Sequence, residues 1–287
     1  MCEKLELPLL EQSNEADLTA SGGHENQIEL IQRKIYSPYK TSIISWDAKT
    51  YEKKVHANIL PVSISCSSER TMTCLFSDTQ LFIYGGFKEN SDGIKEAMVV
   101  DLVSMEVKLK KSGRKRGGAG LALVGWQIYI FGGYKNEYEL LKECDKYDIL
   151  TNKWIRIASL PFYSGSVAAE VYGNDILVAG THLPGLYYYS VGKNTFSKIK
   201  DLPILQDKNI FVHEGKAWIY CNDSWFYESK RYDLTKWRII GYYYGFNMLL
   251  SQHVRIENEL FFLDNSMGIY VFDLHTGILD KFKKSFK

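Results

Sequence analysis

The chain repeats an apolar, strand-like run that ends in glycine, at nearly constant spacing. LFIYGGF matches IYIFGGY, and weaker copies follow as ILVAGT, AWIYCN and LFFLDN. The position of the first glycine recurs at intervals of 47, 48, 41 and 43 residues, at Gly85, Gly132, Gly180, Cys221 and Asp264. A period of this length is typical of architectures in which each repeat is one supersecondary unit.

A second marker keeps the same phase as the first. Each unit next contains an apolar, usually aromatic residue followed by a small polar one, as in Tyr147-Asp148, and in most units another apolar residue follows seven positions later, as in Trp154. The pattern predicts that the aromatic points inward at the end of one strand. The aspartate then accepts backbone N–H groups in the turn that follows.

Six such units predict an all-β fold, a β-propeller of six blades with about four antiparallel strands each. An aromatic content of 14% agrees with β structure. By phase, the blades cover residues 28–60, 61–112, 113–161, 162–203, 204–245 and 246–287. The glycines are then repeat punctuation, where a strand turns sharply against the next blade.

The N-terminal side of the repeat is incomplete. Residues 1–27 are acidic and are expected to form a flexible leader, while residues 28–287 form the propeller domain. The first blade lacks an obvious innermost strand. Residues 5–10 (LELPLL) could close the ring, the ring could close imperfectly, or an N-terminal piece could be missing.

Composition and motifs exclude several classes of protein. No glycine cluster has the strand–helix context of a nucleotide-binding loop, which predicts no cofactor. Histidines are scattered, which predicts no metal site and no catalytic residues, although distant residues can still converge on a propeller axis. A net charge of +1 argues against nucleic acid, and the lack of a signal or long apolar run predicts a cytoplasmic protein without membrane insertion.

These residues resemble the kelch repeat, in which a strand is followed by Gly-Gly, a variable loop, and a Tyr and a Trp with six residues between them. The match is full in IYIFGG with Tyr147 and Trp154, and it weakens toward both ends of residues 28–287. The chain is also similar to the kelch halves of protist proteins that carry a B-box and a coiled coil. The resemblance implies a non-catalytic protein-interaction module or scaffold that binds a partner segment at one rim.

The resemblance also implies which residues form that rim. Arg116 begins the family pattern Arg-x-Gly-x-Gly, and Arg70 keeps the arginine without the glycines. By phase, the same rim position falls on Tyr163, Lys208 and Gln252. Arginine suits a carboxylate-bearing peptide because its planar guanidinium binds carboxylates through two parallel hydrogen bonds.

A basic run, KLKKSGRKR, precedes this rim. It contributes a basic lip made of Lys108, Lys110, Lys111, Arg114 and Lys115. Either the run is a solvated strand edge, or it attracts an acidic or phosphorylated peptide segment, for which the acidic leader is one candidate. Two other functions stay open. One is an enzyme of the kelch-like oxidase or sugar-processing class with an axial active site, and the other is an adaptor of a ubiquitin ligase assembled with a separate partner.

Overall fold

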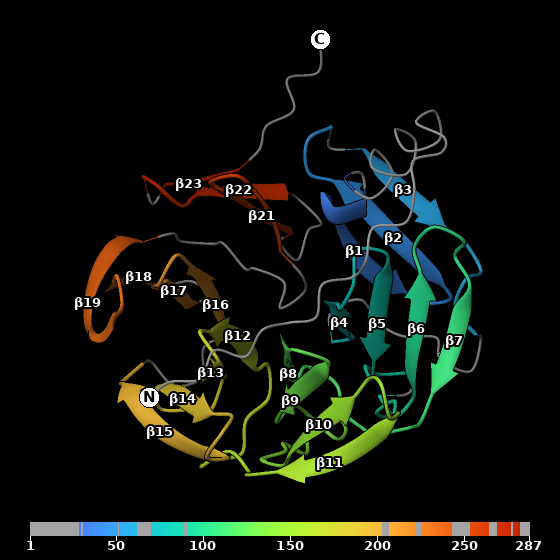
Figure 1. Ribbon diagram of the computed structural model, residues 1–287, viewed down its shortest axis with the longest axis horizontal. Helices are drawn as coiled ribbons and strands as arrows, with labels where there is room; N and C mark the ends of the chain where they lie inside the picture. The colour runs from blue at the N-terminus through green and yellow to red at the C-terminus, as the bar shows by residue number, and fades with distance from the viewer. Residues whose placement is uncertain are drawn as a thin grey trace, which may run out of the picture.

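The computed structural model describes residues 29, 31–50, 52–61, 70–88, 91–202, 207–221, 225–242, 253–263, 269–276 and 278–281. Six small antiparallel sheets stand around a common centre (Figure 1). The chain is therefore an all-β, six-bladed propeller, as the repeat predicts. Within these ranges no helix has the length and apolar character that a membrane span requires.

Each blade is a meander whose strands follow chain order from the centre of the ring outward. The first two blades contain β1 (Lys34–Tyr39), β2 (Ser42–Asp47), β3 (Lys53–His56), β4 (Met72–Leu75), β5 (Gln80–Tyr84), β6 (Ala97–Asp101) and β7 (Val107–Lys110). The third and fourth contain β8 (Gly120–Val124), β9 (Gln127–Phe131), β10 (Cys144–Asp148), β11 (Lys153–Ile157), β12 (Ala168–Tyr172), β13 (Asp175–Ala179), β14 (Leu186–Ser190) and β15 (Thr195–Lys200). The last two contain β16 (Lys208–His213), β17 (Lys216–Cys221), β18 (Trp225–Lys230), β19 (Asp233–Tyr242), β20 (Val254–Ile256), β21 (Glu259–Leu263), β22 (Ile269–Asp273) and β23 (Leu279–Lys281).

The first blade has three strands where every other blade has four. Its β2 ends with Trp46-Asp47, the marker that ends the third strand, β10, of the third blade. In the first blade β1 therefore occupies the position of a second strand, and the innermost position has no strand among the described residues. The expectation of an incomplete first blade is confirmed, whereas the leader and residues 5–10 lie outside the described ranges.

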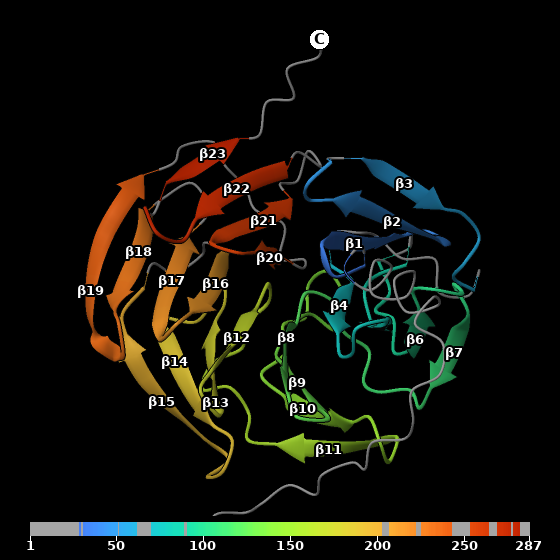
Figure 2. The same ribbon diagram turned by 45° about the horizontal axis from the view of Figure 1, so that its top comes forward.

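Apolar packing between neighbouring blades closes the ring. The buried core divides into six clusters, and each one joins two adjacent blades. At the junction of the last and first blades, Val254 and Phe261 pack with Ile35 and Trp46. Figure 2 shows the sixth blade beside the first, so the chain closes through this interface although the first blade is short of a strand.

The aromatic markers fill the space between blades. Tyr147 is fully buried, and its ring centroid lies 5.2 Å from that of Phe82 in the preceding blade. The ring centroid of Tyr189 likewise lies 5.3 Å from that of Phe131 in the preceding blade. The expectation that the marker aromatic points inward is wrong for the fifth blade. Its marker, Tyr232, is 75% exposed because it lies in the turn between β18 and β19.

The aspartates of the marker hold the turns that follow. Asp148 accepts the backbone N–H of Thr151 at 2.8 Å. Backbone N–H groups also bind the equivalent carboxylates, which belong to Asp47, Asp101, Asp233 and Asp273. A buried aromatic and a turn-closing aspartate thus recur as one local unit.

The glycine doublets occupy positions that other residues cannot enter without strain. Gly85 has a φ of +65°, and a Cβ atom there would lie 2.2 Å from the carbonyl oxygen of Arg116 in the next blade. Gly132 has a φ of +55°, and a Cβ atom there would lie 2.8 Å from the carbonyl oxygen of Ser164. The doublets are therefore repeat punctuation, because each lets two blades approach closely.

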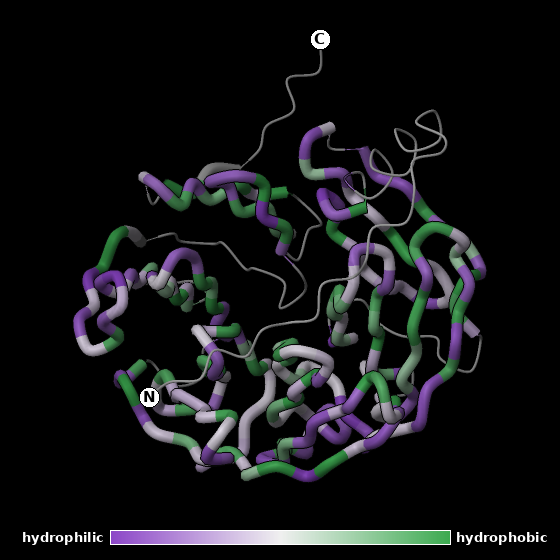
Figure 3. Tube along the Cα trace, viewed as in Figure 1, coloured by the Kyte–Doolittle hydropathy of each residue, from purple (hydrophilic) through white to green (hydrophobic). Residues whose placement is uncertain are grey.

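The outermost strands face solvent on one side. Figure 3 shows hydrophilic and hydrophobic residues interspersed along the outer edge of the ring, where β11 contains Lys153, Ile155, Arg156 and Ile157. Ile157 is buried while the two charged residues are exposed. Ile155, on the same face of the strand as Ile157, is 44% exposed, so β11 is largely open to solvent and packs on the core mainly at its end.

Two alanine substitutions separate backbone strain from close packing. Gly125→Ala should destabilise the protein by about 1–2 kcal/mol, because Gly125 has a positive φ but no atom near its Cβ position. Gly85→Ala should lower the free energy of unfolding by about 1–3 kcal/mol more than Gly125→Ala does, because the new Cβ atom would overlap a neighbouring carbonyl. Urea unfolding monitored by tryptophan fluorescence gives both values, with Gly192→Ala as a neutral control. Equal losses at Gly85 and Gly125 would contradict the close approach.

Candidate partner-binding site

The connections that carry the glycine doublets lie at one face of the ring. In the third blade, Gly120 at the start of β8 pairs with Phe131 at the end of β9, so the segment before β8 meets the loop after β9. The same arrangement joins Met72 to Tyr84 in the second blade. We call this side the glycine face and define it by residues 70–71, 85–88, 111–119, 132–143 and 158–167.

Backbone hydrogen bonds join the blades at the glycine face. The N–H of Gly118 donates to the carbonyl of Arg70 at 2.8 Å, and the N–H of Val167 donates to the carbonyl of Gly118 at 3.0 Å. The N–H of Gly133 donates to the carbonyl of Ser164 at 2.8 Å. Three successive blades are thus held in register by main-chain contacts, so side chains on this face project from a fixed backbone.

Arg70 lies over aromatic rings on this face. Its guanidinium carbon lies 4.3 Å from the ring centroid of Tyr134 and 5.7 Å from that of Phe87. A guanidinium at this range is attracted to the negative face of an aromatic ring. Arg70 is half-buried, so the stack fixes its plane while part of the side chain stays accessible.

Glycines of the neighbouring segments hold Tyr134 in place. A Cβ atom at Gly165 would fall 1.9 Å from a ring carbon of Tyr134, and one at Gly118 would lie 3.4 Å from the same ring. The ring therefore lies directly on the backbone of the third and fourth blades. The position of Arg70 depends on this contact.

A second cation lies over an aromatic ring near Tyr163. The ammonium of Lys142 lies 5.1 Å from the ring centroid of Tyr163, which is 54% exposed. Phe162 beside it is 49% exposed, and Tyr138 in the loop after β9 is 91% exposed. Exposed aromatic rings and cations therefore gather on this part of the glycine face, and these residue types are enriched at protein interfaces.

Arg116 does not have the exposed position expected of a rim residue. It is fully buried, and its guanidinium donates to the carbonyls of Gly132 at 2.9 Å and Glu143 at 3.1 Å and to the carboxylate of Asp145 at 2.5 Å. A buried charge needs such partners because it has lost its hydration. The predicted exposed position of Arg116 at the rim is therefore corrected, and in this structure the residue holds β9 against β10.

Lys208 is also buried. Its ammonium donates to the carbonyl of Gly180 in the preceding blade at 2.7 Å, and burial lowers its pKa to about 8. Its predicted place on an open rim is corrected for the same reason as that of Arg116. Gln252 lies outside the described residues, and of the four predicted rim residues that are described, only Arg70 and Tyr163 are accessible on the glycine face.

The basic lip divides into two parts. Lys108 and Lys110 belong to β7, the outermost strand of the second blade, and therefore lie at the circumference of the ring. Arg114 and Lys115 lie on the glycine face, where each approaches a carboxylate, at 3.5 Å from Asp145 and 2.8 Å from Asp92 respectively. Lys111 is exposed between these two parts.

Sequence reasoning missed the aromatic partners of Arg70, although a signal was present. Phe87 and Tyr134 each follow a glycine doublet directly, in GGF and GGY. An aromatic residue therefore occurs at the same position of two repeats, but the repeat pattern alone does not separate it from the strand motif. The cation–π contacts could not be predicted because Arg70 and Tyr134 belong to different blades.

Sequence reasoning also missed two titratable residues in the axial channel. Glu170 on β12 has its pKa raised to about 8 by burial, and His253, just before β20, has its pKa lowered to about 4 by burial. Each shift favours the uncharged form. The two residues belong to the fourth and sixth blades, so only the closed ring brings them to one cavity.

A comparison with known protein families gives a match to the third blade. Residues 115–161, which include β8 to β11, match the model of the kelch motif. No curated protein matches the chain.

Arg116→Ala should lower the free energy of unfolding by about 3–5 kcal/mol, because Asp145 and two buried carbonyls would lose their donor. Arg70→Ala should cost about 1 kcal/mol or less, because an exposed cation–π contact contributes little. Urea unfolding of both variants measures the difference. A wild-type unfolding midpoint for Arg116→Ala would contradict its assignment as a structural residue.

The pKa of Glu170 makes stability depend on pH. The folded-state pKa is about 8 against 4.5 for an unperturbed group, so the folded protein holds a proton that the unfolded chain releases. The free energy of unfolding should therefore fall as the pH rises from about 6.5 to about 8. Below pH 6.5, His253 changes the free energy of unfolding in the opposite direction, because its folded-state pKa is lowered. In Glu170→Gln this decline should become shallower, as thermal unfolding at several pH values would show, and an unchanged slope would contradict the shift.

Proposed function

We propose that this chain, a six-bladed β-propeller whose third blade matches the kelch motif, is a non-catalytic protein-interaction module that binds a partner segment at its glycine face. Folds of this kind carry many functions, so the proposal rests on the site rather than on the fold. The observation that carries it is the stack of Arg70 on Tyr134, next to the exposed rings of Phe162 and Tyr163.

The geometry favours binding of an extended segment. Backbone hydrogen bonds between blades hold the glycine face rigid, so a partner would meet preformed contacts and lose little conformational entropy on the propeller side. Aromatic rings supply apolar contact area, and the stacked cations would fix the orientation of the bound segment. A segment crossing from Arg70 toward Tyr163 would contact both.

The charges favour a partner with carboxylate or phosphate groups. Among the described residues, Arg70 and Lys142 have no carboxylate within ion-pairing distance, in contrast to Arg114 and Lys115. Their hydrogen-bonding N–H groups are thus open to an anionic side chain of the partner. We propose an acidic or phosphorylated peptide segment, now bound by Arg70 and Lys142 rather than by Arg116.

An axial active site is the second candidate, and one observation favours it. Glu170 and His253 line the same cavity and have pKa values shifted in opposite directions, a combination found in acid–base catalysis. The interaction module remains the preferred function, because Arg70 is stacked on Tyr134 beside the exposed rings of Phe162 and Tyr163.

Peptide selection tests the interaction proposal. Random peptides displayed on phage are selected on the wild-type protein, and enriched peptides are then titrated by fluorescence anisotropy. We expect acidic sequences whose affinity falls about tenfold or more in Arg70→Ala and in Tyr163→Ala, since interface arginines and tyrosines often contribute more than about 1.4 kcal/mol.

Two matched variants on the opposite face serve as controls. Lys193 and Trp126 lie in turns between strands at that face, and both are exposed. Lys193→Ala and Trp126→Ala should bind the selected peptides as the wild type does. If these two variants lose affinity while Arg70→Ala and Tyr163→Ala retain it, the binding face has been assigned to the wrong side of the ring.

A further inference from the structure

A cavity of about 340 Å³ lies among the inner strands of the ring. It is lined by residues of β4, β8, β12 and β16 together with His253 and Phe262. Ligand-binding pockets commonly have volumes of about 300–1,000 Å³. The cavity is therefore large enough for a small molecule of about ten non-hydrogen atoms.

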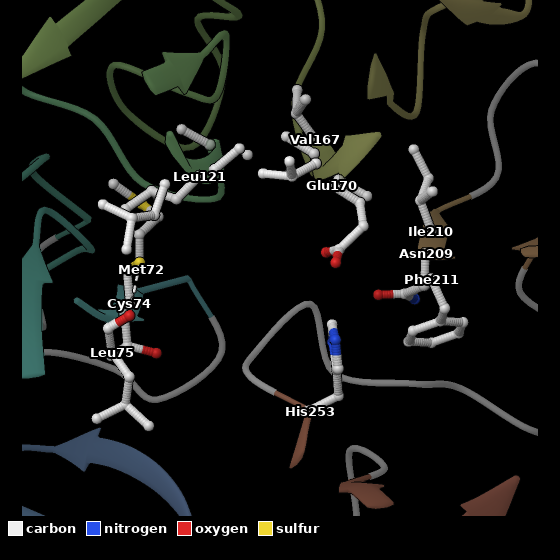
Figure 4. Close-up of a pocket in the computed structure, with 18 of the residues that line it drawn as sticks. Met72, Cys74, Leu75, Leu121, Val167, Glu170, Asn209, Ile210, Phe211 and His253 are labelled. Atoms are coloured by element: carbon white, nitrogen blue, oxygen red, sulfur yellow. Dashed lines mark hydrogen bonds between the residues drawn. The ribbon is translucent and has the colours of Figure 1, made fainter. Parts of the chain in front are cut away.

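Most of the lining is apolar, and three polar side chains point into it. Figure 4 shows the carboxyl of Glu170 and the imidazole of His253 pointing toward one another, with the amide of Asn209 directed into the same space. Apolar walls come from Met72, Leu75, Leu121, Val167, Ile210 and Phe211. An apolar pocket with a few convergent polar groups is the usual composition of a small-molecule site.

Asn209 has an unmet hydrogen-bonding requirement. The residue is only 6% exposed, and its amide nitrogen has no hydrogen-bond partner in the described part of the protein. The hydroxyl of Thr73, also in the lining, is likewise buried without a partner there. An unpartnered buried polar group costs about 1–3 kcal/mol, so a ligand that supplied the missing partner would recover that energy.

The lining carries no charge near neutral pH. The described lining residues include no lysine, arginine or aspartate. Enclosure by the inner strands raises the pKa of Glu170 to about 8, lowers the pKa of His253 to about 4 and raises the pKa of the Cys74 thiol to about 12, and each shift favours the uncharged form. An ion entering the cavity would lose its hydration without meeting a counter-charge, which is unfavourable.

We propose that the axial cavity is a binding site for a small uncharged molecule with an apolar body and an amide or hydroxyl head, the head contacting Asn209 and Glu170. The apolar body packs against Ile210 and Phe211, and the head exchanges hydrogen bonds with the amide of Asn209 and the carboxyl of Glu170. This site is separate from the glycine face and does not depend on the function proposed for that face.

Three probes of one shape and different charge test the site. Benzamide, benzoate and benzylammonium share a phenyl ring and are titrated into the wild-type protein at about pH 6.5, with ligand-observed NMR as the readout. Benzamide should bind about tenfold or more tightly than either ion, since each 1.4 kcal/mol is tenfold in affinity. No binding of benzamide, or equal binding of all three, would overturn the proposal.

Variants locate the contact. Asn209→Leu should weaken benzamide binding about fivefold, the loss expected for one hydrogen bond. Arg70→Ala should leave it unchanged, so failure of the rim proposal and failure of this one are distinguishable. Undiminished benzamide affinity in a folded Asn209→Leu protein would place the probe elsewhere.

A pH series gives a test that needs no apolar substitution. At about pH 9 Glu170 ionises, while the groups that face it, Cys74 and His253, stay uncharged, as their shifted pKa values require. Benzamide affinity should then fall in the wild type and persist in Glu170→Gln, which keeps an uncharged head group at every pH. An equal fall in both proteins would show that Glu170 does not line the binding site.

Discussion

The ring depends on the contact between Arg116 and the backbone around it. The guanidinium of this residue binds the end of β9, the start of β10 and Asp145, while its own carbonyl accepts the N–H of Gly86 from the preceding blade. One buried residue therefore fixes the inside of its own blade and the distance to the preceding blade. Glycine is required at Gly85 because that distance leaves no room for a Cβ atom.

The interfaces between blades then follow one scheme with different side chains. In the middle of the chain an aromatic from one blade packs on an aromatic of the preceding blade, as Tyr147 does on Phe82. Toward the C-terminus the glycine doublet is lost, and buried Lys208 binds the carbonyl of Gly180 across the interface. The main-chain carbonyl of the glycine that follows the second strand of a blade is thus bound by a buried cation in both cases, by Arg116 within a blade and by Lys208 between blades.

How far the sequence could predict this structure depended on the range of the interactions. The blade number, the short first blade and the role of the glycines are local and periodic, and they were predictable from Gly85, Gly132 and the Tyr-Asp marker. Burial of Arg116 was not predictable, because a family pattern gives its place along the chain but not the partners that Asp145 and two carbonyls supply. The cavity around Glu170 and His253 was least accessible to prediction, since these residues meet only when six blades close into a ring.

Main-chain hydrogen bonds from Gly118 and Val167 connect the blades at the same face that carries Arg70 and Tyr163. Loops on that face cannot lengthen or shorten freely without breaking a link in the ring. Divergence of binding preference in proteins built this way must therefore proceed by exchange of side chains on a fixed frame. Turns on the opposite face reach the preceding blade through side chains instead, since Asn152 and Asn194 accept the backbone N–H groups of Lys111 and Ala158.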